Sequence, residues 1–298
     1  MNRQPPLPTF EDVKYREIVN VASVIHRSPF RYPGGKTWLV PHVRRWLSCL
    51  SRRPREFFEP FAGGAIVALT VAAERLAEHV TLVEIDEDIA VTWKTIMSDD
   101  ANWLAHRIAT FELTAESVEA ILSRVQVSLR ERAFQTILRN RINRGGILAP
   151  GAGRLKWGEN RKGIASRWYP KTLANRILAI AAMRDRISFI QGDGIEVIRQ
   201  NSDRTDAVFF IDPPYTAAGK MAGQRLYTHY ELDHEELFRV TASLSGDFLM
   251  TYENAEGIRQ LANNYGFLVQ SIAMKNTHHT KMTELLIGRS HAALDPNP

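Results

Sequence analysis

The chain has 298 residues, a hydrophobic fraction of 44% and a formal net charge of +5 at pH 7. These values are ordinary for a globular protein with a sizeable core, and no apolar run is long enough to span a membrane. The first residues lack a secretory signal, and the single cysteine, Cys49, excludes an intramolecular disulfide. We therefore expect a cytoplasmic protein. We expect no bound metal, because no group of Cys and His has zinc-site spacing.

Helices and strands alternate in the first part of the chain. A polar extension (residues 1–27) is followed by a turn rich in proline and glycine and by a helix from about Lys36. Next come a short strand at Glu56–Phe58, a glycine-containing loop, a helix from about Ala65 and a strand at 80–86. This order predicts a doubly wound α/β fold with a mostly parallel sheet.

The alternation stops at residues 93–181, which are helical in pattern at Leu113–Leu129 and Ala133–Ile142. It then resumes with strands and helices predicted at 187–193, Gly194–Arg199, Ala207–Ile211, His234–Leu244, 247–252, Ala255–Tyr265, 267–274 and 284–289. The simplest interpretation is one α/β domain (28–92 and 182–290) with an inserted helical module (93–181) and a tail (291–298).

Positive charge is concentrated in the inserted module. From Trp93 to Ala181 there are 15 Lys and Arg residues against 7 Asp and Glu residues, and from Arg139 to Arg176 there are 10 against 1. Such segregation is typical of a surface that binds a polyanion, although a solvated basic face has the same composition.

The apolar strand Ala207–Ile211 ends in the tetrapeptide Asp212-Pro213-Pro214-Tyr215. Ligands of open α/β sheets bind beyond the carboxyl ends of the strands, where this tetrapeptide is expected to lie. The Asp212 carboxylate and the Pro213 carbonyl could accept hydrogen bonds from an adenine amino group, and the Tyr215 ring could stack on a flipped base. These groups suit methyl transfer to that amino nitrogen. The alternative is a strand that ends in an Asp-Pro turn.

Two earlier segments are candidates for a cofactor site. The loop after the first strand would let a ligand approach its glycine backbone closely. Its candidate residues are Glu59, Pro60, Phe61, Gly63 and Gly64. The next strand ends in the acidic residues Glu84 and Asp86, and a carboxylate at this spacing can accept hydrogen bonds from ribose hydroxyls. The candidates here are Glu84 and Ile85. Together they favour a cofactor that contains a nucleoside over a plain glycine turn followed by an acidic helix start.

Two more segments are candidates for the same site. Lys36, which follows Tyr32, Gly34 and Gly35, could meet the carboxylate of the cofactor or the target nucleotide, with Tyr32 packed on the cofactor. Asp193 could accept a hydrogen bond from the amino group of the cofactor's adenine. The alternatives are a helix-entry turn with a surface lysine and an aspartate that caps the next helix.

These segments, in this order, resemble the Dam-like adenine-N6 DNA methyltransferases. That family has an aromatic-x-Gly-Gly-Lys element, a Phe-Glu-Pro-Phe-x-Gly-Gly cofactor loop, an inserted recognition module and an Asp-Pro-Pro-Tyr catalytic loop. The matching residues are Tyr32–Lys36, Phe58–Gly64 and Asp212–Tyr215. Residues 143–146 preserve only part of the family's Asn-Arg-x-Gly-x-Asn-Gly-Leu segment.

The resemblance covers about residues 28–289 and implies a Rossmann-like fold, S-adenosylmethionine as the cofactor without a metal, and double-stranded DNA as the partner. Its catalytic residues would be Asp212, Pro213, Pro214 and Tyr215, with Asp212 also near the cofactor. We further expect a bacterial or phage-encoded, nucleoid-associated protein that is a monomer or a weak dimer. A cognate restriction endonuclease is a candidate partner.

The residues expected to contact nucleic acid are Lys36, Arg139, Arg141, Asn143, Arg144, Arg154, Lys156, Arg161 and Lys162. Asp212 favours adenine over cytosine or protein glutamine, because related enzymes for those substrates usually carry Ser or Asn at this position. An RNA adenine-N6 methyltransferase would have the same chemistry, although the inserted helical module favours DNA. A catalytically silent nucleic-acid-binding protein of the same fold is the other alternative, and the intact motif residues argue against it.

Overall fold

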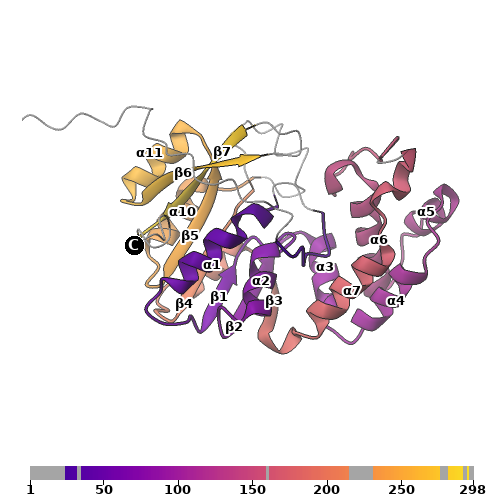
Figure 1. Cartoon of the computed structure of the whole chain (residues 1–298), viewed down its shortest axis with the longest axis horizontal. Coiled ribbons are helices and arrows are strands. Elements are labelled where there is room, and N and C mark those ends of the chain that lie inside the picture. Colours follow the sequence, from indigo (N-terminus) through magenta and orange to yellow (C-terminus); the bar gives the residue numbers. More distant parts are fainter. Residues whose placement is uncertain are drawn as a thin grey trace, which may run out of the picture.

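The computed structural model describes residues 24–31, 35–158, 161–214, 231–275, 281–290 and 294. In this part of the chain, seven strands form one sheet in the order β3-β2-β1-β4-β5-β7-β6 (Figure 1). Their bounds are β1 Glu56–Glu59, β2 His79–Glu84, β3 Ile187–Gln191, β4 Ala207–Ile211, β5 Asp247–Glu253, β6 Leu268–Lys275 and β7 Lys281–Gly288. Strands β1 to β5 pair in parallel, and β7 is antiparallel to both β5 and β6.

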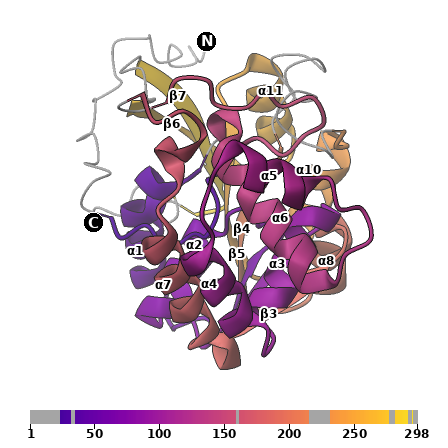
Figure 2. The same ribbon diagram turned by 90° about the vertical axis from the view of Figure 1, so that its right-hand side faces the viewer.

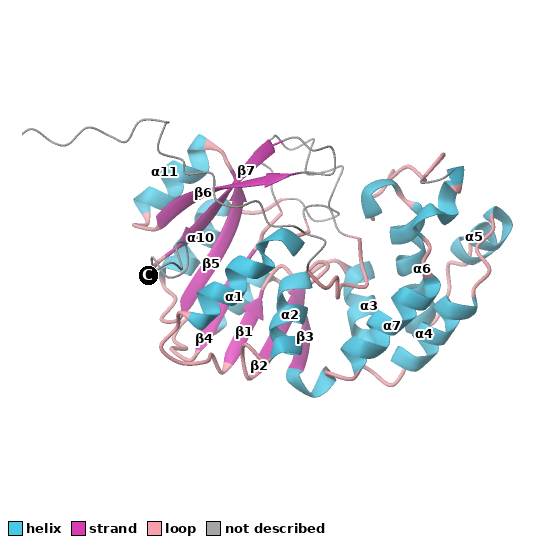
Figure 3. Cartoon of the chain, viewed as in Figure 1, coloured by secondary structure: helices cyan, strands magenta, loops and turns pink. Residues whose placement is uncertain are grey.

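Helices cover both faces of the sheet (Figure 3). The helices are α1 Val40–Ser48, α2 Ile66–Glu74, α3 Glu87–Ile96, α4 Ala101–Thr110, α5 Ala115–Leu122, α6 Leu129–Ile142, α7 Pro170–Ala181, α8 Gly194–Gln200, α10 His234–Ala242 and α11 Glu256–Asn264. In β4, Phe210 packs in the core that includes α1, α2 and α3, whereas Phe209 and Ile211 pack with α8, α10 and α11. Consecutive strand side chains point to opposite faces, so the predicted doubly wound fold is confirmed.

The strand order changes direction between β1 and β4. Strand β1 pairs with β2 on one side and with β4 on the other, so the chain builds the sheet outward in both directions from this pair. A crevice forms at such a switch point because the connections from the two central strands leave toward opposite faces. The fold therefore positions a ligand site at the carboxyl ends of β1 and β4.

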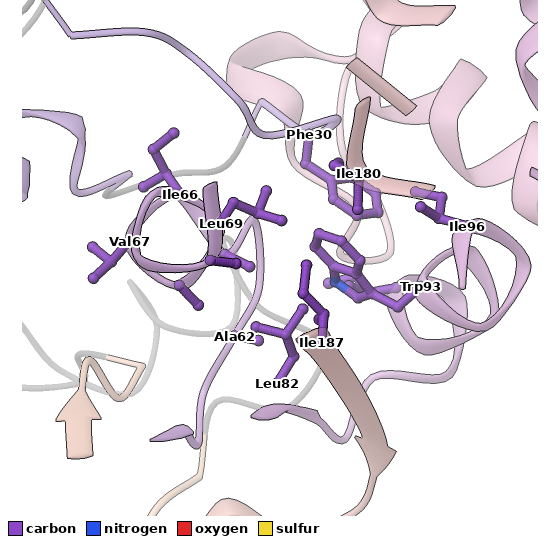
Figure 4. Close-up of a cluster of buried hydrophobic side chains, with 14 of the residues drawn as sticks. Phe30, Ala62, Ile66, Val67, Leu69, Leu82, Trp93, Ile96, Ile180 and Ile187 are labelled. Carbon is purple, nitrogen blue, oxygen red and sulfur yellow. The ribbon is translucent and has the colours of Figure 1, made fainter. Parts of the chain in front are cut away.

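The inserted helices α4 to α7 lie beside the sheet, next to α3 (Figures 1 and 2). Helix α4 packs on α7, and α6 packs on α3. Trp93 of α3, Phe134 of α6 and Ile180 of α7 belong to the same buried cluster as the strand residues Phe57 and Leu82. Figure 4 shows Trp93 in this cluster beside Phe30, with Ile180 on the Phe30 side and Leu82 and Ile187 on the other. The module thus shares its core with the sheet.

One predicted helix, Leu113–Leu129, is wrong in extent. In the structure α5 ends at Leu122 and a separate helix, α6, begins at Leu129. The break is specified by a capping box, in which the Ser128 side chain accepts a hydrogen bond from the Glu131 N–H while the Glu131 carboxylate accepts one from the Ser128 N–H. The strands and helices predicted after residue 182 are confirmed, with ends that differ by a few residues.

Residues 1–23 of the predicted extension lie outside the described residues, as does the predicted tail apart from Leu294. In the described ranges, none of the helices has the length and apolar character needed to cross a membrane. No group of three or more His, Cys, Asp or Glu side chains in those ranges is arranged to hold a metal ion.

Candidate active site

A pocket lies at the carboxyl ends of β1, β2 and β4, at the switch point of the sheet. Glu59 is the last residue of β1, Glu84 is the last residue of β2, and Asp212 directly follows β4. The predicted site residues that line this pocket are Gly35, Lys36, Glu59, Pro60, Phe61, Gly63, Gly64, Glu84, Ile85, Asp193, Asp212, Pro213 and Pro214. Tyr32, Gly34 and Tyr215 lie outside the described residues.

The loop after β1 is held against the helix that follows it. Ala65, with φ +50° in the left-handed region, is the N-cap of α2. Glu59 Oε2 accepts a hydrogen bond of 2.7 Å from the Ala68 N–H, one of the N–H groups that lack partners at a helix start. Burial raises the pKa of Glu59 well above its ordinary value. Glu59 therefore secures the start of α2 as well as lining the pocket.

Glu84 is buried and accepts two backbone hydrogen bonds. Its Oε2 accepts from the Gly63 N–H at 2.9 Å, and its Oε1 accepts from the Asp86 N–H at 2.9 Å. Burial raises the pKa of Glu84 to about 7, with the two N–H donors acting in the opposite direction. The carboxyl group joins the glycine loop to the start of α3, and its position in the pocket suits an acceptor of ligand hydroxyl groups.

Asp193 performs the capping role that was the alternative to cofactor binding. Its Oδ1 accepts a hydrogen bond of 2.7 Å from the Ile195 N–H at the start of α8. The same residue lines the pocket. Gly194 packs directly on the glycine loop, because a Cβ there would lie 2.3 Å from the carbonyl oxygen of Pro60. Asp193 is thus fixed at the pocket by its cap, and its contact with adenine stays a prediction.

Lys36 forms a buried ionic cluster with two carboxylates. Its Nζ lies 3.1 Å from Asp212 Oδ1 and 3.4 Å from Glu284 Oε2, and its side chain is 2% exposed. Thr251 donates a hydrogen bond of 2.7 Å to the same Oδ1 of Asp212. The Asp212 carboxylate is therefore oriented by one cation and one hydroxyl before any ligand binds. Its side chain remains 22% exposed toward the pocket.

The charges of this cluster perturb each other strongly. Burial lowers the pKa of Lys36, but the nearby carboxylates of Asp212 and Glu284 outweigh it and raise the value overall. Burial raises the pKa of Glu284 to about 7 despite the opposing effect of Lys36. Lys36 therefore stays charged at neutral pH, where Glu284 titrates. Lys36 thus holds Asp212 and also lines the pocket, and its contact with the cofactor carboxylate or the nucleotide stays a prediction.

Glu284 and Thr251 are site residues that the sequence analysis did not identify. Glu284 lies in β7 beside the fully buried residues Leu285, Leu286 and Ile287. A Glu next to such an apolar run could have been recognised in the sequence as a buried carboxylate with a partner, because buried acids are rare unless they have one. Thr251 carried no comparable signal, since threonine is common in strands.

The predicted nucleic-acid contacts separate into buried and exposed residues. Arg141 and Asn143 are 5% and 8% exposed, and their side chains donate to the carbonyl oxygens of Pro29 and Ile147. These two predictions are wrong, because neither side chain is available to a duplex. Arg141 follows Phe134, Ile137 and Leu138 on the buried face of α6, a helical spacing that was visible in the sequence.

Arg139 and Arg154 are partly engaged with protein carboxylates. Arg139 Nη2 lies 2.8 Å from Asp88 Oδ2, and Arg154 Nη2 lies 3.1 Å from Glu119 Oε2. The remaining predicted contacts are exposed: Arg144, Lys156, Arg161 and Lys162. The chain between α6 and α7, which carries them, lies at the same end of the molecule as the carboxyl ends of the parallel strands (Figure 1).

Comparison with known proteins identifies one family. The family model of the D12 class N6 adenine-specific DNA methyltransferases matches residues 32–277. A search of curated proteins found no match.

Similar solved structures include an rRNA methyltransferase, aviRa, from Streptomyces viridochromogenes, at 13% identity with a TM-score of 0.40, covering 95% of this chain and 99% of that chain. Another is a methyltransferase from Geobacter sulfurreducens, at 11% identity with a TM-score of 0.38, covering 87% and 80%. A third is the tRNA methyltransferase TrmK of B. subtilis, at 11% identity with a TM-score of 0.37, covering 85% and 66%.

Proposed function

Because the chain belongs to the D12 class N6 adenine-specific DNA methyltransferases, we propose that it transfers a methyl group to N6 of an adenine flipped out of duplex DNA. The observation that carries the proposal is the Asp212 carboxylate, which follows β4 at the pocket and is oriented by Lys36 and Thr251. A preoriented acceptor at this place can bind an amino group without reorganising during the reaction.

The family implies S-adenosylmethionine as the methyl donor, and the residues of the pocket fit it. Glu84 offers a buried carboxylate for ribose hydroxyls, and Asp193 offers an acceptor for an adenine amino group. Phe61, Ile66 and Ile85 supply apolar surface for an aromatic ring. When bound, the cofactor supplies an electrophilic methyl group on a sulfonium.

Asp212 and Pro213 would act on the target nitrogen. The lone pair of an adenine amino group is delocalised into the ring, which makes the nitrogen a poor nucleophile. Hydrogen bonds from its two N–H groups to the Asp212 carboxylate and the Pro213 carbonyl would favour a tetrahedral nitrogen whose lone pair faces the methyl group. As the new carbon–nitrogen bond forms, the bond between the methyl carbon and sulfur would break, and its electron pair would leave with the thioether product. Positive charge would develop on the nitrogen beside the Asp212 carboxylate, and one N–H proton would then pass to water.

Cofactor binding is expected to release protons near pH 7. The pKa of Glu84 is raised to about 7, and ribose hydroxyls that donate to the carboxylate would lower it again. Affinity for S-adenosylhomocysteine should therefore increase as the pH rises through 7, and calorimetry in buffers of different ionisation enthalpy should detect the released protons. Glu84→Gln should abolish this dependence. Wild-type affinity that does not change across pH 7 would contradict the assignment of Glu84.

The exposed cations of the module are expected to contact DNA phosphates. Replacing Lys156 and Arg161 together by Ala should weaken duplex binding and reduce the slope of log K against log salt by about 0.9 for each phosphate that the variant no longer neutralises. Arg141→Met is the contrasting variant: because Arg141 is buried, it should lower the melting temperature and leave the slope unchanged. If the salt slope changed with Arg141→Met and not with the Lys156 and Arg161 double variant, Arg141 would be the DNA contact instead of the surface pair.

The polymer substrate is tested by incubating the protein with labelled S-adenosylmethionine and either unmethylated duplex DNA or RNA. Label in DNA supports the proposal, whereas label in RNA alone would favour an RNA adenine methyltransferase. Cofactor binding without label in either polymer would favour a silent nucleic-acid-binding protein.

A further inference from the structure

One wall of the pocket is an irregular segment, residues 26–31, called here the N-terminal wall. His26, Ser28 and Phe30 line the pocket, and the segment belongs to neither a helix nor a strand. No backbone group of residues 26–30 forms a backbone–backbone hydrogen bond with another described residue. Phe30 is 1% exposed, and its ring packs edge-on against Trp93 with centroids 6.0 Å apart (Figure 4). The wall needs other groups to fix its backbone.

Asn140 of α6 supplies much of this support. Its Oδ1 accepts a hydrogen bond of 2.8 Å from the Arg31 N–H, and its Nδ2 donates to the Arg31 carbonyl at 2.7 Å. The same Nδ2 donates to the Gly146 carbonyl at 2.7 Å. The side chain is fully buried, so its amide joins the wall to α6 and to the loop that begins the basic stretch.

Further contacts reach the wall from the module. Arg141 and Arg176 donate to the carbonyl oxygens of Pro29 and Ser28. Gly146 approaches the wall so closely that a Cβ on it would lie 2.1 Å from the Arg31 carbonyl oxygen. Backbone groups of three wall residues are therefore held by the inserted module rather than by the sheet.

We propose that Asn140 is a positioning residue for the cofactor: it fixes the N-terminal wall against the inserted module and so keeps the pocket in its binding shape. This inference rests on the proposed function, because it takes the ligand of the pocket to be S-adenosylmethionine. Asn140 also links the inserted module to the pocket through a physical contact. Arg31 lies five residues before Lys36, so the same support acts close to the cluster that orients Asp212.

The test compares two buried amides on one helix. Gln135 also lies on α6, and its Nε2 donates to the Ile121 and Arg124 carbonyls within the module. Asn140→Ala and Gln135→Ala should both lower the melting temperature, because each leaves buried carbonyls without donors. Only Asn140→Ala should weaken the binding of S-adenosylhomocysteine, by about tenfold in calorimetry. It should also accelerate hydrogen exchange of the Arg31 amide.

A second pair of variants keeps every hydrogen-bonding side chain. Gly145 and Gly146 both have positive φ values, +65° and +78°, but a Cβ on Gly145 meets only the Ile147 side chain at 3.6 Å. Gly146→Ala should therefore reduce S-adenosylhomocysteine affinity and Gly145→Ala should not, even if Asn140→Ala fails to fold.

The inference would be overturned if Asn140→Ala bound S-adenosylhomocysteine as tightly as Gln135→Ala, and Gly146→Ala as tightly as Gly145→Ala. A wild-type protein that binds no S-adenosylhomocysteine would instead overturn the proposed function. In that event the exchange measurement still decides whether Asn140 fixes the wall: faster exchange at Arg31 in Asn140→Ala than in Gln135→Ala supports it, and equal rates refute it.

Discussion

Replacing Asp212 by Asn is expected to reduce methyl transfer by about 10³-fold, without a comparable loss of affinity for S-adenosylhomocysteine. An amide has one acceptor oxygen, whereas the Asp212 carboxylate must accept from Lys36 and Thr251 and still receive the adenine amino group. The NH₂ group of Asn would face one of these donors, and the negative charge that stabilises the developing cation on nitrogen would be lost. Single-turnover methylation measures the effect on chemistry.

A matched control for this variant is Asp206→Asn. Asp206 directly precedes β4 at the strand's other end and forms an ion pair with Arg204, away from the pocket. The Asp206→Asn variant should therefore methylate at nearly the wild-type rate. If Asp212→Asn kept most of the wild-type rate, the carboxylate would not be the acceptor for the amino group.

Replacing Lys36 by Met is expected to cause the largest loss of stability among the site variants. The side chain is 2% exposed and lies between two carboxylates, and removal of one partner from a buried ion pair costs about 3–5 kcal/mol. Burial already raises the pKa of Glu284 from 4.5 to about 7, and loss of the cation would raise it further. Ionised Glu284 opposes folding, so its contribution to stability is present below pH 4.5 and is lost as the pH rises through about 7.

The destabilisation by Lys36→Met should therefore be larger above pH 7 than below it, as measured by urea unfolding. The double variant Lys36→Met with Glu284→Gln should recover part of the loss, because one buried carboxylate is removed with the cation. Lys94→Met serves as the surface control, since Lys94 donates to the exposed Gln191 side chain. A pH-independent effect, or no recovery in the double variant, would show that Lys36 and Glu284 are not coupled.

The sequence predicted the parts of the fold that depend on patterns of residues close together in the chain. The alternation of strands and helices predicted parallel strands, and parallel strands place the residues at their carboxyl ends, here Glu59, Glu84 and Asp212, at one edge. That reasoning located the pocket without knowledge of any tertiary interaction. It could not locate Thr251 or Glu284, because they lie in β5, which pairs with β4, and in β7, which pairs with β5, and this strand pairing is not encoded locally.

The inserted module was predicted least accurately, for two physical reasons. Charge alone suggested that Arg141 contacts DNA, but its place on the buried face of α6 puts it under the N-terminal wall. Ser128, the N-cap of α6, fell within the helix predicted at Leu113–Leu129. For Arg141 the periodicity of the helix contained the answer, and for the helix break the capping-box residues Ser128 and Glu131 did. Phosphate contacts are therefore better sought among Arg144, Lys156 and their exposed neighbours.

The proposed transfer to adenine N6 is tested most directly by identifying the methylated nucleoside. Duplex DNA incubated with the protein and S-adenosylmethionine would be digested to nucleosides and analysed by mass spectrometry against standards. N6-methyldeoxyadenosine is expected in the wild-type reaction, with a nearly complete loss of it in the Asp212→Asn reaction. A methylated cytosine in place of adenine, or N6-methyldeoxyadenosine at wild-type levels with Asp212→Asn, would contradict the proposal.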